Sequence, residues 1–164
     1  MTNKSNRLRL VQIATLWFLV ATSAVAESDR ARQCLPVGGS ILTNLAVVDA
    51  NTTLGTATGD LRGAVAATIL GIAPGPNGTT VFTVQHHFVT EAGDNIDVDK
   101  AEATAVMVAP DLFAIVSYPV KIVGGTGRFK GAIGAIENIG EVNLADGHTI
   151  FRYHGRVCFS VPGK

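Results

Sequence analysis

After residue 26, apolar and polar residues alternate along most of the chain in short runs, and Gly, Asn, Asp and Pro separate these runs. A β-strand turns successive side chains to opposite faces, whereas a helix needs apolar residues three and four positions apart. No helical spacing of this kind is sustained after Ala26. The pattern therefore predicts eight or nine strands and no helix. The predicted strands span residues 39–48, 55–61, 64–72, 79–90, 96–108, 113–123, 128–135, 139–144 and 149–161.

Short turn signals connect these strands in order along the chain. Residues 73–78 are rich in Pro and Gly, and Asp146-Gly147 is a typical hairpin turn. Consecutive strands joined in this way pair antiparallel, and such a meander can close on itself so that no strand edge stays exposed. We therefore predict a single all-β domain, an eight-stranded antiparallel β-barrel with room inside for side chains or one small ligand.

The alternation also predicts which side chains face the barrel interior. In strand 79–90 they are Phe82, Val84, His86 and Phe88, and in strand 149–161 they are Phe151, Tyr153, Gly155, Val157 and Phe159. In strand 113–123 they are Ala114, Val116, Tyr118, Val120 and Ile122, and in segment 128–139 they are Phe129, Gly131, Ile133, Ala135 and Glu137. A register error of one residue would reverse each of these assignments.

The first 26 residues have the three parts of a secretory signal peptide. A basic stretch ends at Arg9, an apolar stretch runs from Leu10 to Val20, and the small residues Ala24-Val25-Ala26 follow. An uncleaved membrane anchor is the alternative, but this apolar stretch is much shorter than the roughly 20 residues that span a bilayer. We expect cleavage after about Ala26, a mature domain of residues 27–164, and a secreted or periplasmic location.

Two cysteines lie in the mature part, Cys34 near its start and Cys158 near its end. In an exported protein such a pair indicates a disulfide. A redox pair or metal ligands are alternatives, but redox cysteines usually lie close together in sequence, and Cys34 has no neighbouring His or Cys. A bond between these two cysteines would join the first strand to the last, as a closed barrel requires.

The charge balance limits the classes of partner. The leader contains Lys4, Arg7 and Arg9 but no acidic residue, so the mature chain is weakly acidic although the whole chain has a formal net charge of zero. A weakly acidic domain lacks the basic surface that would attract nucleic acids or anionic membranes. We expect no nucleic-acid partner, and no membrane partner once the signal peptide is removed.

One block resembles a known family. The segment Tyr118-Pro-Val-Lys-Ile-Val-Gly-Gly-Thr-Gly-Arg-Phe-Lys-Gly-Ala-Ile-Gly134 is similar to a signature of the dirigent and allene oxide cyclase proteins. Residues 55–61 resemble a short strand near the dirigent N-terminus, and residues 151–157 resemble the aromatic-rich final strand. The resemblance covers most of residues 40–160, and only the block 118–134 is specific. It implies a calycin-like barrel with a hydrophobic cavity, bacterial relatives among its members, and a homodimer or homotrimer.

The resemblance also implies a function without a cofactor. Proteins of these families confine or steer a hydrophobic intermediate, so we expect an isomerase or cyclase that acts on a small hydrophobic molecule. The acidic stretch of residues 91–97 is not the dirigent motif, and the allene oxide cyclase pocket is not reproduced position by position. Two alternatives therefore stay open: a non-catalytic binder or carrier of an apolar ligand, and a structural barrel packed solid.

Four polar residues are candidates for catalysis because they share faces with apolar residues: His86, Tyr118, Tyr153 and Glu137. Within a cavity, a histidine can transfer protons, a tyrosine hydroxyl can orient an oxygen, and a buried carboxyl can act as an acid. For each, ordinary core packing is the alternative. The aromatic residues expected to contact the ligand are Phe82, Phe88, Phe129 and Phe151.

Other chemistries have weak signals. The Gly-rich residues 124–131 lack the helix and the Lys-Ser/Thr ending of a nucleotide-binding loop, so a tight turn explains them better. His86 and His87 are adjacent on a strand and point to opposite faces, so they cannot bind one metal together. We expect no metal and no cofactor.

Overall fold

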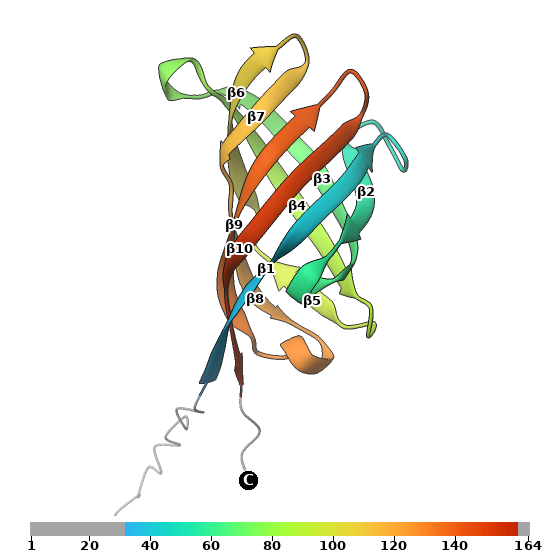
Figure 1. Cartoon of the computed structure of the whole chain (residues 1–164), viewed down its shortest axis with the longest axis vertical. Coiled ribbons are helices and arrows are strands. Elements are labelled where there is room, and N and C mark those ends of the chain that lie inside the picture. The colour runs from blue at the N-terminus through green and yellow to red at the C-terminus, as the bar shows by residue number, and fades with distance from the viewer. Residues whose placement is uncertain (1–31, 161–164) are drawn as a thin grey trace, which may run out of the picture.

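The computed structural model describes residues 32–160, and the predicted signal peptide lies outside them. Ten strands form one antiparallel sheet that closes on itself (Figure 1). They are β1 (Arg32–Leu45), β2 (Thr52–Ala57), β3 (Gly63–Pro74), β4 (Thr80–Thr90), β5 (Asn95–Val98), β6 (Ala101–Ala109), β7 (Leu112–Ser117), β8 (Pro119–Gly125), β9 (Ile133–Asn143) and β10 (His148–Ser160). Three single 3-10 turns accompany them: η1 (Gly59–Leu61), η2 (Pro76–Gly78) and η3 (Gly127–Phe129).

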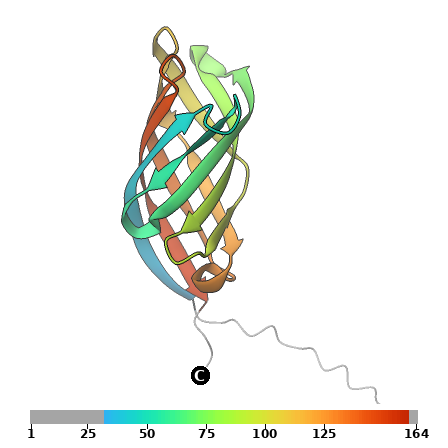
Figure 2. The ribbon, with the colours of Figure 1, turned by 90° about the vertical axis from the view of Figure 1, so that its right-hand side faces the viewer.

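The ten strands occupy eight positions around the barrel. β5 and β6 both pair with β4, and β7 and β8 both pair with β9, so each of these couples fills one position. Pairing of β10 with both β1 and β9 closes the barrel, and the strands tilt against its axis (Figure 2). The predicted eight-stranded antiparallel barrel is confirmed, with strands 96–108 and 113–123 each divided in two.

The sulfurs of Cys34 and Cys158 form a disulfide. The two residues lie directly opposite each other in the ladder between β1 and β10, near the lower end of the barrel in Figure 1. The predicted disulfide is therefore confirmed, and it joins the first strand to the last. It is consistent with an oxidising, extracellular environment. Within residues 32–160, no helix is long and apolar enough to cross a membrane.

Two of the four predicted inward faces are correct over their whole length. The side chains of Phe82, Val84, His86 and Phe88 in β4 are buried, as are Tyr153 and Val157 in β10. Both strands are regular on the inner side, so the period of two holds from end to end. β4 and β10 therefore supply the aromatic and polar residues that the alternation predicted for the interior.

The other two predicted faces are wrong in part. Val116 is exposed and Ile115 is buried, because a bulge at Ser117 shifts the register before Tyr118. In β9, Ile136 and Asn138 are buried while Glu137 is not. Phe129 belongs to η3 rather than to a strand, so counting from it gave the opposite parity for β9. The prediction that Glu137 faces the interior is therefore wrong, because a shift of one residue turns each side chain of the strand to the other face.

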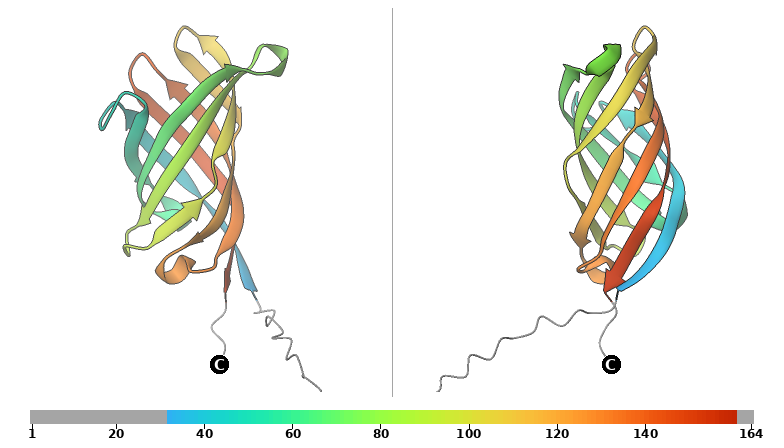
Figure 3. Two further views of the ribbon diagram at one scale, coloured as in Figure 1. Left: turned by 180° about the vertical axis from the view of Figure 1, so that it is seen from behind. Right: turned by 90° about the vertical axis from the view of Figure 1, so that its left-hand side faces the viewer.

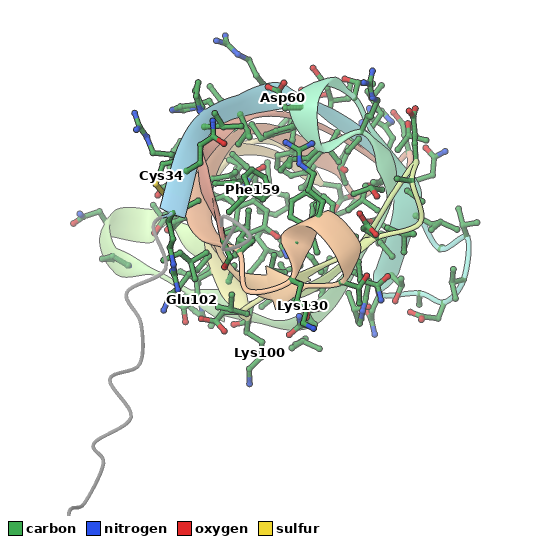
Figure 4. The ribbon with its side chains drawn as sticks, turned by 90° about the horizontal axis from the view of Figure 1, so that it is seen from below. Cys34, Asp60, Lys100, Glu102, Lys130 and Phe159 are labelled. Atoms are coloured by element: carbon green, nitrogen blue, oxygen red, sulfur yellow. A yellow bond between two sulfur atoms is a disulfide. The ribbon has the colours of Figure 1, made fainter. Side chains whose placement is uncertain are left out.

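The lower end of the barrel is closed by packed side chains. η1, which carries Asp60, and η3 lie at this end, and Phe159 lies beside η3 toward the middle of the barrel (Figure 4). The Tyr153 hydroxyl donates to the Thr58 carbonyl (2.7 Å) and accepts from the Leu61 N–H (2.9 Å), which holds η1 in place. Phe129 packs edge-on against Phe159 with ring centroids 5.4 Å apart. Tyr153, Phe129 and Phe159 therefore do not line the interior cavity.

Candidate functional site

A cavity lies inside the barrel, and its lining extends to Leu45, the last residue of β1, which ends in the upper part of the barrel in Figure 1. The space open to the centre of a water molecule measures about 60 Å³, and on this measure one water needs roughly 10–15 Å³. Its wall contains no Asp, Glu, Lys or Arg. The lining residues are Ile41, Thr43, Leu45, Thr53, Val65, Ala67, Ile69, Phe82, Val84, His86, Phe88, Ala103, Ile115, Tyr118, Val120, Ile136, Asn138, Val142, Thr149 and Phe151.

His86 and Tyr118 form a polar pair in this otherwise apolar wall. The Tyr118 hydroxyl lies 2.6 Å from Nε2 of His86, and the two side chains are 5% and 8% exposed, respectively. Nδ1 of His86 is the one buried side-chain nitrogen or oxygen in the described residues that has no hydrogen-bond partner. Leaving such an atom unpaired costs roughly 1–3 kcal/mol. The pair therefore has a hydrogen-bonding position that the protein itself does not satisfy.

Burial keeps both members of the pair uncharged at neutral pH. Removal from water, and to a smaller extent the neighbouring His87, together lower the pKa of His86 to about 4. Removal from water also raises the pKa of the Tyr118 hydroxyl well above its usual value. Because the phenol is the stronger acid of the two neutral groups, it is the better donor to Nε2, which places the imidazole proton on Nδ1. In that tautomer the unpaired atom is a hydrogen-bond donor.

The bulge between β7 and β8 places Tyr118 in the cavity wall. The backbone N–H of Tyr118 donates to Oε1 of Glu137 at 2.7 Å. Its carbonyl accepts from both the backbone N–H and the side-chain amide of Asn138, each at 3.0 Å. Side chains of β9 thus replace ladder bonds that the bulge interrupts. Glu137 therefore positions Tyr118 from outside the cavity.

His86 lies where the barrel wall is incomplete. β5 pairs with β4 at Phe88 and beyond, and β6 pairs with β4 as far as Val84, so neither strand reaches the backbone between them. The Gln85 side-chain amide lies across this gap and donates to the carbonyls of His86 (3.2 Å) and Val98 (3.3 Å). A groove of about 330 Å³ runs along the outside of the gap. A single layer of side chains thus separates the cavity from solvent there.

Three threonines add a second polar patch nearer the upper end. Oγ1 of Thr43 and Oγ1 of Thr149 lie 2.7 Å apart, and Thr53 donates to the Ala67 carbonyl at 3.3 Å. These residues and Asn138 are not among the candidates that the sequence predicted. Thr43 and Thr149 hold inward positions in strands 39–48 and 149–161, so the alternation contained the signal for both.

The sequence candidates divide between cavity and core. His86 and Tyr118 line the cavity, and so do the predicted ligand-contacting residues Phe82, Phe88 and Phe151. Tyr153 and Phe129 pack in the closed lower end instead, and Glu137 lies outside the wall. Among the described residues, no group of three or more His, Cys, Asp or Glu side chains could hold a metal ion.

Comparison with known proteins gives distant matches among solved structures. No family model and no curated protein sequence matches the chain. The pterocarpan synthase dirigent protein GePTS1 matches over 88% of this chain and 99% of its own, with 15% identity and a TM-score of 0.38. The pterocarpan synthase dirigent protein PsPTS1 matches over 80% and 97%, with 16% identity and a TM-score of 0.35.

Proposed function

We propose that the protein binds a small, uncharged and largely apolar molecule inside the barrel and holds one oxygen of that molecule at the His86–Tyr118 pair. The observation that supports this proposal is an apolar cavity with a buried, neutral hydrogen-bonding pair in its wall and an unpaired atom on that pair. A solidly packed structural barrel would have no reason to keep an unpaired polar atom in its core.

The cavity wall defines the class of ligand. A charged ligand would need a counter-charge, and the wall offers none. Nδ1 is closed off in this structure, so a ligand reaches it only after a rotation of the imidazole. With the proton on Nδ1 the pair then donates a hydrogen bond, and the matching group is an acceptor such as a carbonyl or ether oxygen. Pockets for drug-sized ligands measure about 300–1,000 Å³, so a ligand of that size would require the upper end of the barrel to widen.

Confinement by this cavity also supports the isomerase or cyclase activity expected from the sequence. A neutral histidine with a pKa of about 4 is a weak base, and a tyrosine with a raised pKa is a weak acid. The pair is therefore better suited to orienting an oxygen, and to stabilising charge that develops on it, than to full proton transfer. On this mechanism the barrel selects one conformation of a reactive intermediate, and the intermediate reacts in that conformation.

A matched ligand pair tests the binding proposal. Cyclohexanone and methylcyclohexane have similar shapes, and only the ketone has an oxygen. We expect the wild-type protein to bind the ketone several-fold more tightly in an NMR titration, since a neutral hydrogen bond contributes roughly 0.5–1.5 kcal/mol. Tyr118→Phe and His86→Phe should remove this preference, whereas Tyr153→Phe, the same change outside the cavity, should retain it. Equal affinities in the wild type would disprove the proposed hydrogen bond.

Catalysis needs a separate measurement. Native mass spectrometry of the protein purified from its own host would identify a co-purifying molecule. Incubation of that molecule or its precursor with the protein should then change the ratio of product isomers if the barrel steers a reaction. An unchanged ratio together with stoichiometric binding would favour the carrier.

A further inference from the structure

We propose that the upper end of the barrel docks on the uncharged surface of a lipid layer and exchanges its apolar ligand with that layer. The proposal rests on the proposed function for the identity of the cargo. The docking surface itself consists of side chains outside the cavity. These six residues, here called the rim, are Val47, Val48, Leu70, Ile72, Met107 and Val108.

The rim is the most exposed apolar part of the described structure. Its six side chains are between 53% and 65% exposed, and among the other large apolar residues of 32–160 only Val116 exceeds one half. They come from three separate chain segments: the loop after β1, the end of β3 and the end of β6. All three segments reach the same end of the barrel, and the β3–β4 hairpin bends outward there (Figures 1 and 3).

The rim continues into the cavity. Leu45 and Ile69 line the cavity. Along the chain, Leu45 is two positions before Val47, and Ile69 is directly before Leu70. Ile72 pairs with Phe82, which places it on the inner side of the sheet beyond the end of β2. An apolar molecule that leaves the cavity upward therefore meets aliphatic side chains all the way to the surface.

Charge at this end selects the kind of lipid. The turns beside the rim contain Asp49, Asp111 and Asp146, and none of them contains Lys or Arg. Lys100 lies between β5 and β6 and Lys130 directly after η3, so neither belongs to these turns; both are labelled in the view from below (Figure 4). Three carboxylates would be repelled by anionic headgroups. The rim thus fits an uncharged or zwitterionic surface and not an anionic one.

The chemistry of the rim also favours lipid over a protein partner. Protein interfaces are enriched in aromatic residues and Arg at their centres, and the rim has neither. Several aliphatic side chains around an opening, all at one end of the molecule, instead suit shallow insertion into a flat apolar layer.

Vesicle flotation tests the proposal. The wild-type protein should float with phosphatidylcholine vesicles and float less when phosphatidylglycerol is added. Val48→Asp combined with Met107→Asp should weaken binding more than about tenfold, since a carboxylate in the apolar layer is costly. The matched control changes Val123 and Ile133 to Asp, because both are 43% exposed and lie toward the lower end. If the Asp pair impairs folding, Val48→Ser with Met107→Ser provides the second test.

The results separate docking from ligand binding. Absence of flotation, or an equal loss in the rim and control variants, would overturn the docking proposal. Cyclohexanone binding, measured without vesicles, tests the cavity independently. Flotation without ketone binding would support the rim and refute the cavity function, whereas ketone binding without flotation would do the reverse.

Discussion

The hydroxyl of Tyr118 lies 2.6 Å from Nε2 of His86, although His86 belongs to β4 and Tyr118 lies between β7 and β8, neither of which pairs with β4. The hydrogen bond therefore crosses the barrel interior rather than following a strand ladder. Both side chains are buried, and the Tyr118 hydroxyl and Nε2 of His86 are hydrogen-bond partners of each other. Removing either one leaves a polar atom in an apolar environment, which makes the pair an energetic unit.

A double-mutant cycle should detect this coupling. His86→Phe leaves the Tyr118 hydroxyl unpaired, and Tyr118→Phe leaves Nε2 unpaired, so each single change should reduce the free energy of unfolding by roughly 1–3 kcal/mol. The double variant should be less destabilised than the sum of the two, because it leaves no orphaned polar group. Urea unfolding of the four proteins measures the coupling. Strict additivity would show that the hydrogen bond contributes nothing to stability.

Acid should destabilise the fold through His86. Burial lowers the pKa of His86 from 6.5 to about 4 in the folded state, so between these values the unfolded chain binds more protons. The contribution of His86 to the free energy of unfolding is therefore complete above pH 6.5, and it is lost as the pH falls toward 4. From pH 7.5 to 4.5 we expect the free energy of unfolding to fall by about 2–3 kcal/mol through this group.

Comparison of variants isolates this contribution from other acid effects. His86→Phe should show a smaller loss than the wild type over the same pH range. Parallel pH profiles for His86→Phe and the wild type would mean that His86 titrates normally in the folded protein.

The sequence predicted the barrel and half of the site because the inner positions of β4 and β10 alternate without interruption. His86 and Phe88 followed directly from that regularity. Tyr118 was also assigned to the interior, but from a register that placed Val116 there too, and Val116 is exposed. The bulge at Ser117 restores the parity for Tyr118. Its one sequence signal is Pro119, since proline inside a strand often marks a bulge.

Contacts between non-adjacent strands could not be predicted from the sequence. Periodicity assigns a face to a side chain but does not say which residue lies across the interior, so the His86–Tyr118 bond was beyond its reach. The roles of Glu137 and Asn138 depend on the parity of β9, which one misplaced residue reverses. The exposed rim depends on how far β3 and β6 extend beyond their neighbours, and the sequence alone does not report that difference.

Glu137 should act by positioning Tyr118 and not as an acid. Glu137→Ala removes the acceptor for the Tyr118 N–H, and we expect a loss of about 1 kcal/mol in unfolding free energy. It should also change the NMR shifts of the His86 ring. Glu137→Gln keeps an oxygen acceptor and should restore both values to near those of the wild type. If Glu137→Gln instead abolished ligand binding while the fold stayed intact, the carboxylate would have a direct role.

Tyr153 should stabilise the closed end of the barrel without affecting the cavity. Its hydroxyl bonds the carbonyl of Thr58 and the N–H of Leu61, and Gly39 lies so close that a Cβ there would collide with the tyrosine ring and the Thr58 carbonyl. Tyr153→Phe should reduce the free energy of unfolding by roughly 1–3 kcal/mol. Amide hydrogen exchange should become faster at Leu61, while cyclohexanone affinity stays unchanged. Loss of ketone binding in a folded Tyr153→Phe protein would mean that the cavity and the closed end are coupled.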